Sequence, residues 1–144
     1  LLISIRRINI IMAIAITNLA NTTATAVITA ASDIAVTDII IFNTDSHTGS
    51  FFDWSLNLIP NGDSDSIDNL LYSSSLVTTG YANPLYPGSN IHVNTITGFI
   101  GNKWLLSTGD SFEVALFDAS NTSPTWSGTP TSVPVNVFVN YIGL

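Results

Sequence analysis

The chain has 144 residues, no cysteine, and three basic against ten acidic residues, which give a formal net charge of −7. This length is typical of one domain, and the missing cysteines exclude disulfides, thiolate metal sites and cysteine catalysis. The acidic balance argues against nucleic acid and against an anionic membrane surface, because both are bound by clustered Lys and Arg.

Charged residues make up 9% of the chain, where about a quarter is usual in soluble domains. Ser, Thr and Asn therefore supply most of the polar surface. Such a surface carries little charge to keep neighbouring copies apart. The composition favours a subunit that packs against other subunits.

Residues 1–16 form an apolar opening segment that Arg6 and Arg7 interrupt. Its apolar run is too short for a membrane span, which needs about 20 residues. A trimmed precursor and an extension upstream of Met12, the only methionine, are the remaining readings. We predict an extended arm that pairs with a sheet edge, for example on a neighbouring copy. The β-branched interface residues of this arm are Ile3, Ile5, Ile8 and Ile10.

Residues 17–144 are predicted to form one all-β domain, an antiparallel β-sandwich of jelly-roll type. Short runs that alternate apolar and polar residues indicate strands with one buried face. In residues 34–42 only Thr37 and Asp38 are polar, which predicts burial on both faces. The predicted strands are residues 25–29, 34–42, 51–59, 70–77, 91–97, 111–117 and 135–142.

Turn residues separate these runs, as at Asn61-Gly62 and Pro87-Gly88. Residues 119–134 are rich in Ser, Thr and Pro and are predicted to be a long loop. No window has the periodicity of an amphipathic helix, although residues 66–71 fit one short helical turn.

Asp63, Asp65 and Asp68 lie close together in a predicted loop. Carboxylates converging in a loop are ligands for calcium, so this loop is the candidate metal site. The spacing does not match an EF-hand, because glycine is missing at the sixth position and Ser74 stands where the bidentate Glu belongs. The competing interpretation is a solvated turn with no cofactor.

Catalytic patterns are weak. His47 and His92 are the only histidines, and no Gly-x-Ser-x-Gly elbow accompanies them. We therefore expect no enzyme activity. A buried lysine beside an asparagine and a carboxylate could form an intramolecular isopeptide bond, and Lys103 and Glu113 fall on strands that we predict to be adjacent.

Aromatic residues in predicted loops are candidates for contact with a partner. Exposed loop aromatics stack on sugars or anchor protein interfaces. A loop folded over its own aromatic side chain is the alternative. The residues concerned are Tyr81, Tyr86 and Trp126.

From about residue 23 to the end, the chain resembles small β-sandwich virion proteins of tailed bacteriophages. The resemblance is carried by strand–turn segments at residues 39–44, 58–62, 68–71, 106–114 and 135–142. The segment at residues 81–86 and the loop before residue 133 depart from the pattern.

The resemblance implies a non-catalytic structural protein of the virion, such as a capsid decoration (cement) or tail-associated protein. We expect a homo-oligomer, a trimer, that contacts the major capsid or tail protein after assembly in the host cytoplasm. The alternatives are a carbohydrate-binding or receptor-binding module and a secreted filament subunit joined by donor-strand exchange.

Overall fold

A computed structural model gives the structure of the chain. It describes residues 12–19, 23–44, 52–64, 67–74, 83–96, 98–101, 103–118 and 135–144. The elements in chain order are β1 (Met12–Asn18), β2 (Thr25–Thr29), β3 (Ile34–Asn43), β4 (Phe52–Ile59), the 3₁₀ turn η1 (Ile67–Asn69), β5 (Leu70–Ser73), β6 (Asn90–His92), the 3₁₀ turn η3 (Val93–Thr95), β7 (Trp104–Leu106), β8 (Ser111–Asp118) and β9 (Val135–Gly143).

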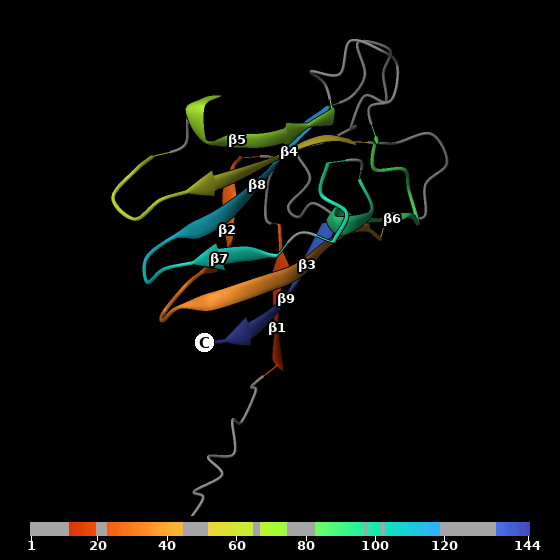
Figure 1. Cartoon of the computed structure of the whole chain (residues 1–144). Helices are drawn as coiled ribbons and strands as arrows, with labels where there is room; N and C mark the ends of the chain where they lie inside the picture. Colours follow the sequence, from red (N-terminus) through yellow and green to blue (C-terminus); the bar gives the residue numbers. More distant parts are fainter. Residues whose placement is uncertain are drawn as a thin grey trace, which may run out of the picture.

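The strands form two antiparallel sheets that pack face to face (Figure 1). Sheet A has the order β1-β9-β3-β6, and β7 also pairs with β3; sheet B has the order β2-β8-β4-β5. β6 and β7 pair with opposite ends of β3. Taken together as one interrupted strand, they complete the strand order of a jelly roll. The predicted all-β sandwich is confirmed.

Burial follows the predicted alternation. β3 is buried along most of its length on both faces, as its nearly continuous apolar sequence predicts. On β8 the three apolar residues of one face are at most 2% exposed. On β9 the inward valines are fully buried, and the residues of the opposite face are half-buried. These inward residues are Phe112, Val114, Leu116, Val135, Val137 and Val139.

Aromatic rings cross the core from one sheet to the other. Trp54 of β4 lies 4.9 Å from Tyr72 of β5, measured between ring centroids. Contacts continue through Phe99 to Trp104 of β7 and then to Phe112 of β8 at 5.6 Å. Tilted and edge-on contacts of this kind add about 0.5–1.5 kcal/mol each beyond simple burial. The chain of rings therefore helps to hold sheet A on sheet B.

The start of the domain differs from the predicted boundary. We placed the arm at residues 1–16, but β1 begins at Met12 and pairs with β9 of the same chain over all its seven residues. Residues 12–16 thus belong to sheet A. Residues 1–11, with the predicted arm contacts, lie outside the described residues.

Short strands account for the other differences. β6 ends at His92, where the backbone turns into η3, and β7 has only the three residues Trp104–Leu106. β7 pairs with β3 in sheet A, whereas β8 pairs in sheet B. Lys103 beside β7 and Glu113 of β8 are therefore not on neighbouring strands. Lys103 is also exposed, so the isopeptide interpretation is wrong.

The turn between β7 and β8 requires glycine. Gly109 has φ of +90°, and a Cβ there would clash with the Asn61 side chain. We expect Gly109→Ala to lower the free energy of unfolding by about 2 kcal/mol, from backbone strain plus overpacking. Gly62→Ala is the matched control, because Gly62 has a similar φ of +88° and nothing within 4 Å of its Cβ position.

Urea unfolding of both variants measures the difference, and Gly62→Ala should cost about 1 kcal/mol. Asn61→Ala should relieve part of the Gly109→Ala cost, because it removes the atoms that the new methyl group meets. Equal losses in the two glycine variants would contradict the packing argument.

Candidate functional site

Several of the exposed large hydrophobic side chains lie on the outer face of sheet A. On β1 every second side chain points outward, and Met12, Ile14 and Ile16 are 77%, 62% and 63% exposed. The pairing places half-buried apolar residues of β9 and β3 beside them. We call this surface the outer face; its apolar residues are Met12, Ile14, Ile16, Ile40, Phe42, Leu105, Phe138 and Ile142.

The register arranges these side chains in rows across the strands. One row runs from Ile16 through Phe138 to Ile40. A second row runs from Met12 through Ile142, and continues across β3 to Leu105, which is 73% exposed. Side chains opposite one another in adjacent antiparallel strands are in contact range. Each row therefore forms an apolar strip across sheet A.

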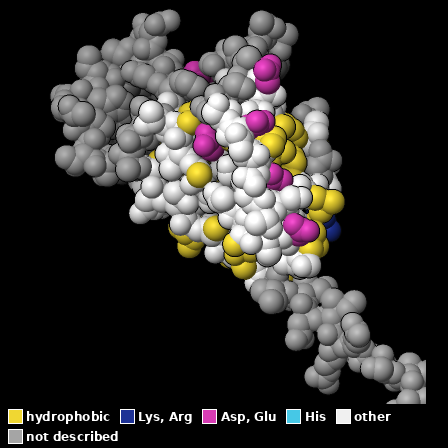
Figure 2. All heavy atoms as spheres, turned by 90° about the vertical axis from the view of Figure 1, so that its left-hand side faces the viewer, with side chains coloured by type: hydrophobic (Ala, Val, Ile, Leu, Met, Phe, Trp, Pro, Cys, Tyr) yellow, Lys and Arg dark blue, Asp and Glu magenta, His cyan; other side chains and the backbone are white. Residues whose placement is uncertain are grey.

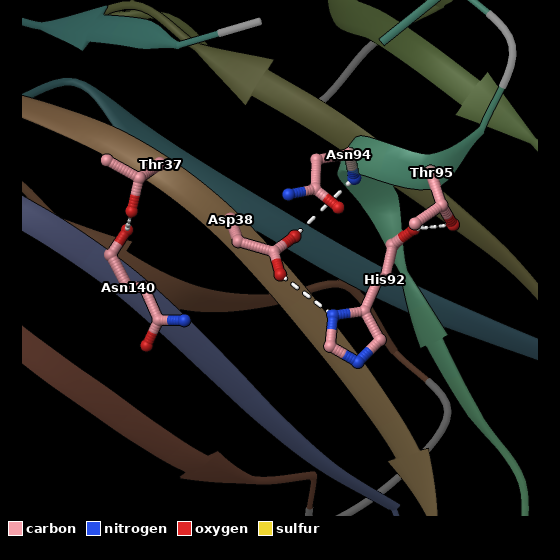
Figure 3. Close-up of polar contacts among 6 residues, drawn as sticks. All are labelled: Thr37, Asp38, His92, Asn94, Thr95 and Asn140. Atoms are coloured by element: carbon pink, nitrogen blue, oxygen red, sulfur yellow. Dashed lines mark hydrogen bonds and ion pairs between the residues drawn. The ribbon is translucent and has the colours of Figure 1, made fainter. Parts of the chain in front are cut away.

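Between the two rows, Ile14 lies opposite Asn140 and Asn140 lies opposite Asp38, so polar groups separate the rows. Figure 3 shows the polar contacts around Asp38. The carboxylate of Asp38 on β3 is 2.9 Å from Nδ1 of His92 on β6, and it accepts a bond from the Asn94 amide at 3.4 Å. Nearby, the Thr37 hydroxyl donates to the Asn140 carbonyl at 3.2 Å. Thr37 lies at the irregularity where the β3–β9 register shifts. These bonds satisfy the polar groups and fix η3 against sheet A.

The Asp38–His92 pair joins β3 to β6 and to η3. Asp38 contacts the His92 ring and the Asn94 amide, and the Thr95 hydroxyl donates to the His92 carbonyl at 2.7 Å. The pair therefore has a structural role in the described part of the chain.

Two hollows indent the outer face. One, of about 300 Å³, lies on β3, β6 and β9 around Phe42, His92 and Phe138. The other, of about 600 Å³, lies at the β1 side around Ile14 and Asn140. Hollows between apolar rows allow side chains of a partner to interdigitate, which a flat sheet does not.

The end of the sandwich that carries the β2–β3, β4–β5 and β7–β8 connections is acidic, unlike the apolar outer face. Asp33, Asp63, Asp68 and Asp110 lie in the β2–β3, β4–β5 and β7–β8 connections. Figure 2 views this end and shows acidic side chains spread over it. Asp110 is engaged, since its carboxylate accepts the backbone amides of Asn61 and Ser107 at 2.9 Å.

Only part of the predicted calcium site lies within the described residues. Asp63 and Asp68 are exposed, and Asp65 lies outside the described residues. Among the residues that the structure describes, no group of three potential ligands could hold a metal ion. A calcium site in this loop stays a prediction.

Of the predicted interface aromatics, only Tyr86 is described. It is 55% exposed and lies in the turn that follows Leu85, where its carbonyl accepts bonds from the Ser89 amide and hydroxyl. Tyr81 and Trp126 lie outside the described residues.

The sequence interpretation missed Met12, Ile14 and Ile16 as surface residues. The signal was present, because Ala13 and Ala15 stand between them and make a strict large–small alternation.

Comparisons of the chain with protein-family models, with curated proteins and with solved structures give no match. In the part of the chain that is described, no helix is long and apolar enough to cross a membrane.

Proposed function

We propose that the chain is a non-catalytic structural subunit of a virion, a capsid decoration or tail-associated protein that works by packing against other subunits. The observation that carries this proposal is the exposure of Met12, Ile14 and Ile16, at 62–77%, on the outer face. Burying one large aliphatic side chain is worth about 1.5–3 kcal/mol. A shell or tail protein that covers the outer face would recover this free energy.

Charge supports the same proposal. The strands of the outer face contribute Asp38 as their one carboxylate among the described residues, and Asp38 is only 8% exposed and paired with His92. A surface without free charges suits close packing with another protein. Jelly rolls occur in viral capsid proteins, and also in lectins and cupins, so the topology is compatible with the proposal without selecting it.

The two alternatives have less support in the described residues. A sugar-binding module would depend on Tyr81, Tyr86 and Trp126, of which only Tyr86 is described. A filament subunit would depend on residues 1–11, which lie outside the described part of the chain. The strands that carry the outer face, β1, β3, β6, β7 and β9, lie within the described residues.

The test is whether the chain travels with particles and whether the outer face holds it there. Particles are purified on a density gradient from the culture that expresses the chain, and the chain is measured in the particle band. We expect Ile14→Lys to lower its amount about tenfold or more, because 1.4 kcal/mol corresponds to a factor of ten. Folding should persist, since Ile14 is 62% exposed.

Ile100→Lys is the matched control. Ile100 is 70% exposed but lies in the turn before β7, outside the rows of the outer face. This variant should remain in the particle band. Absence of the wild-type chain from particles would overturn the proposed function, and equal retention of both variants would remove the outer face from it.

A further inference from the structure

We propose that β1 pairs with β1 of a second copy, antiparallel and across a two-fold axis at Ala15, so that two copies of sheet A become one continuous sheet. This inference rests on the proposed function in one respect, namely that the outer face is an assembly surface. It adds the partner, a second copy of this chain, and the register of the contact.

β1 is the edge strand of sheet A. It pairs with β9 on one side, and none of the described strands pairs with its other side. Proteins usually protect such an edge with charges, proline or a bulge. The β1 sequence Met-Ala-Ile-Ala-Ile-Thr-Asn contains no charged residue and no proline, and its register with β9 has no shift. Nothing in the β1 sequence, and no strand among the described residues, blocks strand addition at this edge.

The hydrogen-bonding groups of this edge can be assigned to residues. The Leu19 amide donates to the Val135 carbonyl at 3.0 Å, and this pair continues the β1–β9 register. Because hydrogen-bonded and non-bonded pairs alternate in an antiparallel ladder, the odd-numbered residues of β1 direct their backbone groups to β9. Met12, Ile14, Ile16 and Asn18 therefore direct theirs to the open edge.

One register uses the whole strand. A two-fold axis at Ala15 places Met12 opposite Asn18 of the second copy and Ile14 opposite Ile16 of the second copy. Each of these pairs joins residues whose amides and carbonyls face the open edge, so each pair both donates and accepts. The same register keeps all outward side chains on one face, as a sheet with one buried face requires.

The side chains of β1 also favour this register. The isoleucines of the two copies would meet on the outer face, and β-branched cross-strand pairs stabilise a sheet by about 0.2–1 kcal/mol each. The acidic groups of the connections, which would repel in a dimer of copies with charge −7, are absent from β1. A second copy therefore meets no like charge along this strand, and a strongly charged partner would find no complement there.

Pairing of the two β1 strands would place the outer faces of the two copies side by side. The row through Ile16 would continue onto Ile14 of the second copy, and the combined sheet would have the strand order β6-β3-β9-β1-β1-β9-β3-β6. The dimer would then present one wide apolar face to a shell, with twofold symmetry of the interface. A two-fold dimer also replaces the trimer that we expected from the sequence.

Cysteine cross-linking tests the register directly, because the chain has no cysteine of its own. At the axis the two Ala15 residues form a non-bonded pair with a Cα separation of about 4.5 Å, which is within disulfide range. Ala15→Cys should oxidise to a species of twice the 15.3 kDa chain mass on a non-reducing gel. Thr17→Cys should not, since its copies would be about 14 Å apart.

A mixture of Ala13→Cys and Thr17→Cys completes the test, because these positions lie opposite each other in the proposed register. It should cross-link, whereas Thr17→Cys alone should give no cross-linked species on the non-reducing gel. Sedimentation equilibrium of the unmodified chain should give a dimer, and Ile14→Pro, which removes an amide of the open edge, should shift it towards monomer.

Monomeric or trimeric wild-type chain, or cross-linking of Thr17→Cys as strong as that of Ala15→Cys, would overturn the β1 pairing. Retention of the chain in the particle band together with such a result would leave the proposed function standing. Absence of the wild-type chain from the particle band, together with an Ala15→Cys dimer, would overturn the proposed function and leave the β1 pairing standing.

Discussion

Trp54→Ala is expected to lower the free energy of unfolding by about 3–5 kcal/mol, the range for removal of a large buried aromatic side chain. Trp54 is fully buried on β4 at the centre of sheet B and stacks on Tyr72. Its indole Nε1 donates to the Asn83 carbonyl at 2.7 Å. The substitution therefore leaves a cavity and also frees the loop that contains Asn83.

The loss is large compared with the total stability of a domain, which is about 5–15 kcal/mol. Urea unfolding followed by far-ultraviolet circular dichroism measures it. Trp54→Phe is the control, because it keeps most of the ring volume and removes the indole donor, for a cost near 1 kcal/mol. Similar losses for Phe and Ala would contradict a packing origin.

Trp54 also illustrates why the sandwich could be predicted. On β4 the apolar residues recur at every second position, and the sequence placed Phe52, Trp54 and Leu56 on one face; all three are at most 2% exposed. Alternation of this kind reports directly on burial, because successive side chains of a strand point to opposite faces. Burial on both faces of β3 could be predicted from its nearly continuous apolar sequence.

Short elements could not be predicted, because their position depends on long-range pairing. β7 has three residues, Trp104–Leu106, and exists because it pairs with β3 far away in the chain. β6 ends at His92, where the Asp38 carboxylate binds the ring and the following amide of Asn94. A local window of sequence contains neither Asp38 nor β3.

The candidate site was the hardest part to predict. The sequence interpretation assigned residues 1–16 to an arm, because the sequence alone does not show which strand pairs with this isoleucine-rich segment. Only the pairing of β1 with β9 places Ile14 and Ile16 on the surface of a sheet. Sequence periodicity gives the faces of a strand but not which face another layer covers.

Proline substitutions at neighbouring positions of β1 should lower the free energy of unfolding by different amounts. Ala15 directs its backbone groups to β9, opposite Val139, so Ala15→Pro removes a ladder hydrogen bond and leaves a carbonyl of a central strand without its donor. We expect a loss of about 3 kcal/mol in the free energy of unfolding. Ile14 directs its amide to the open edge, where proline is tolerated, so Ile14→Pro should cost less than about 1 kcal/mol.

Thermal and urea unfolding of the two variants, each at a concentration where the chain is monomeric, would measure the contrast. Ile14→Ala separates loss of the side chain from loss of the amide, because it keeps the donor. If Ile14→Pro were the more damaging of the two, the backbone orientation assigned to β1 from the Leu19–Val135 bond would be reversed. The two-fold register at Ala15 would then be excluded, because Ala15, not Ile14, would direct its amide to the open edge.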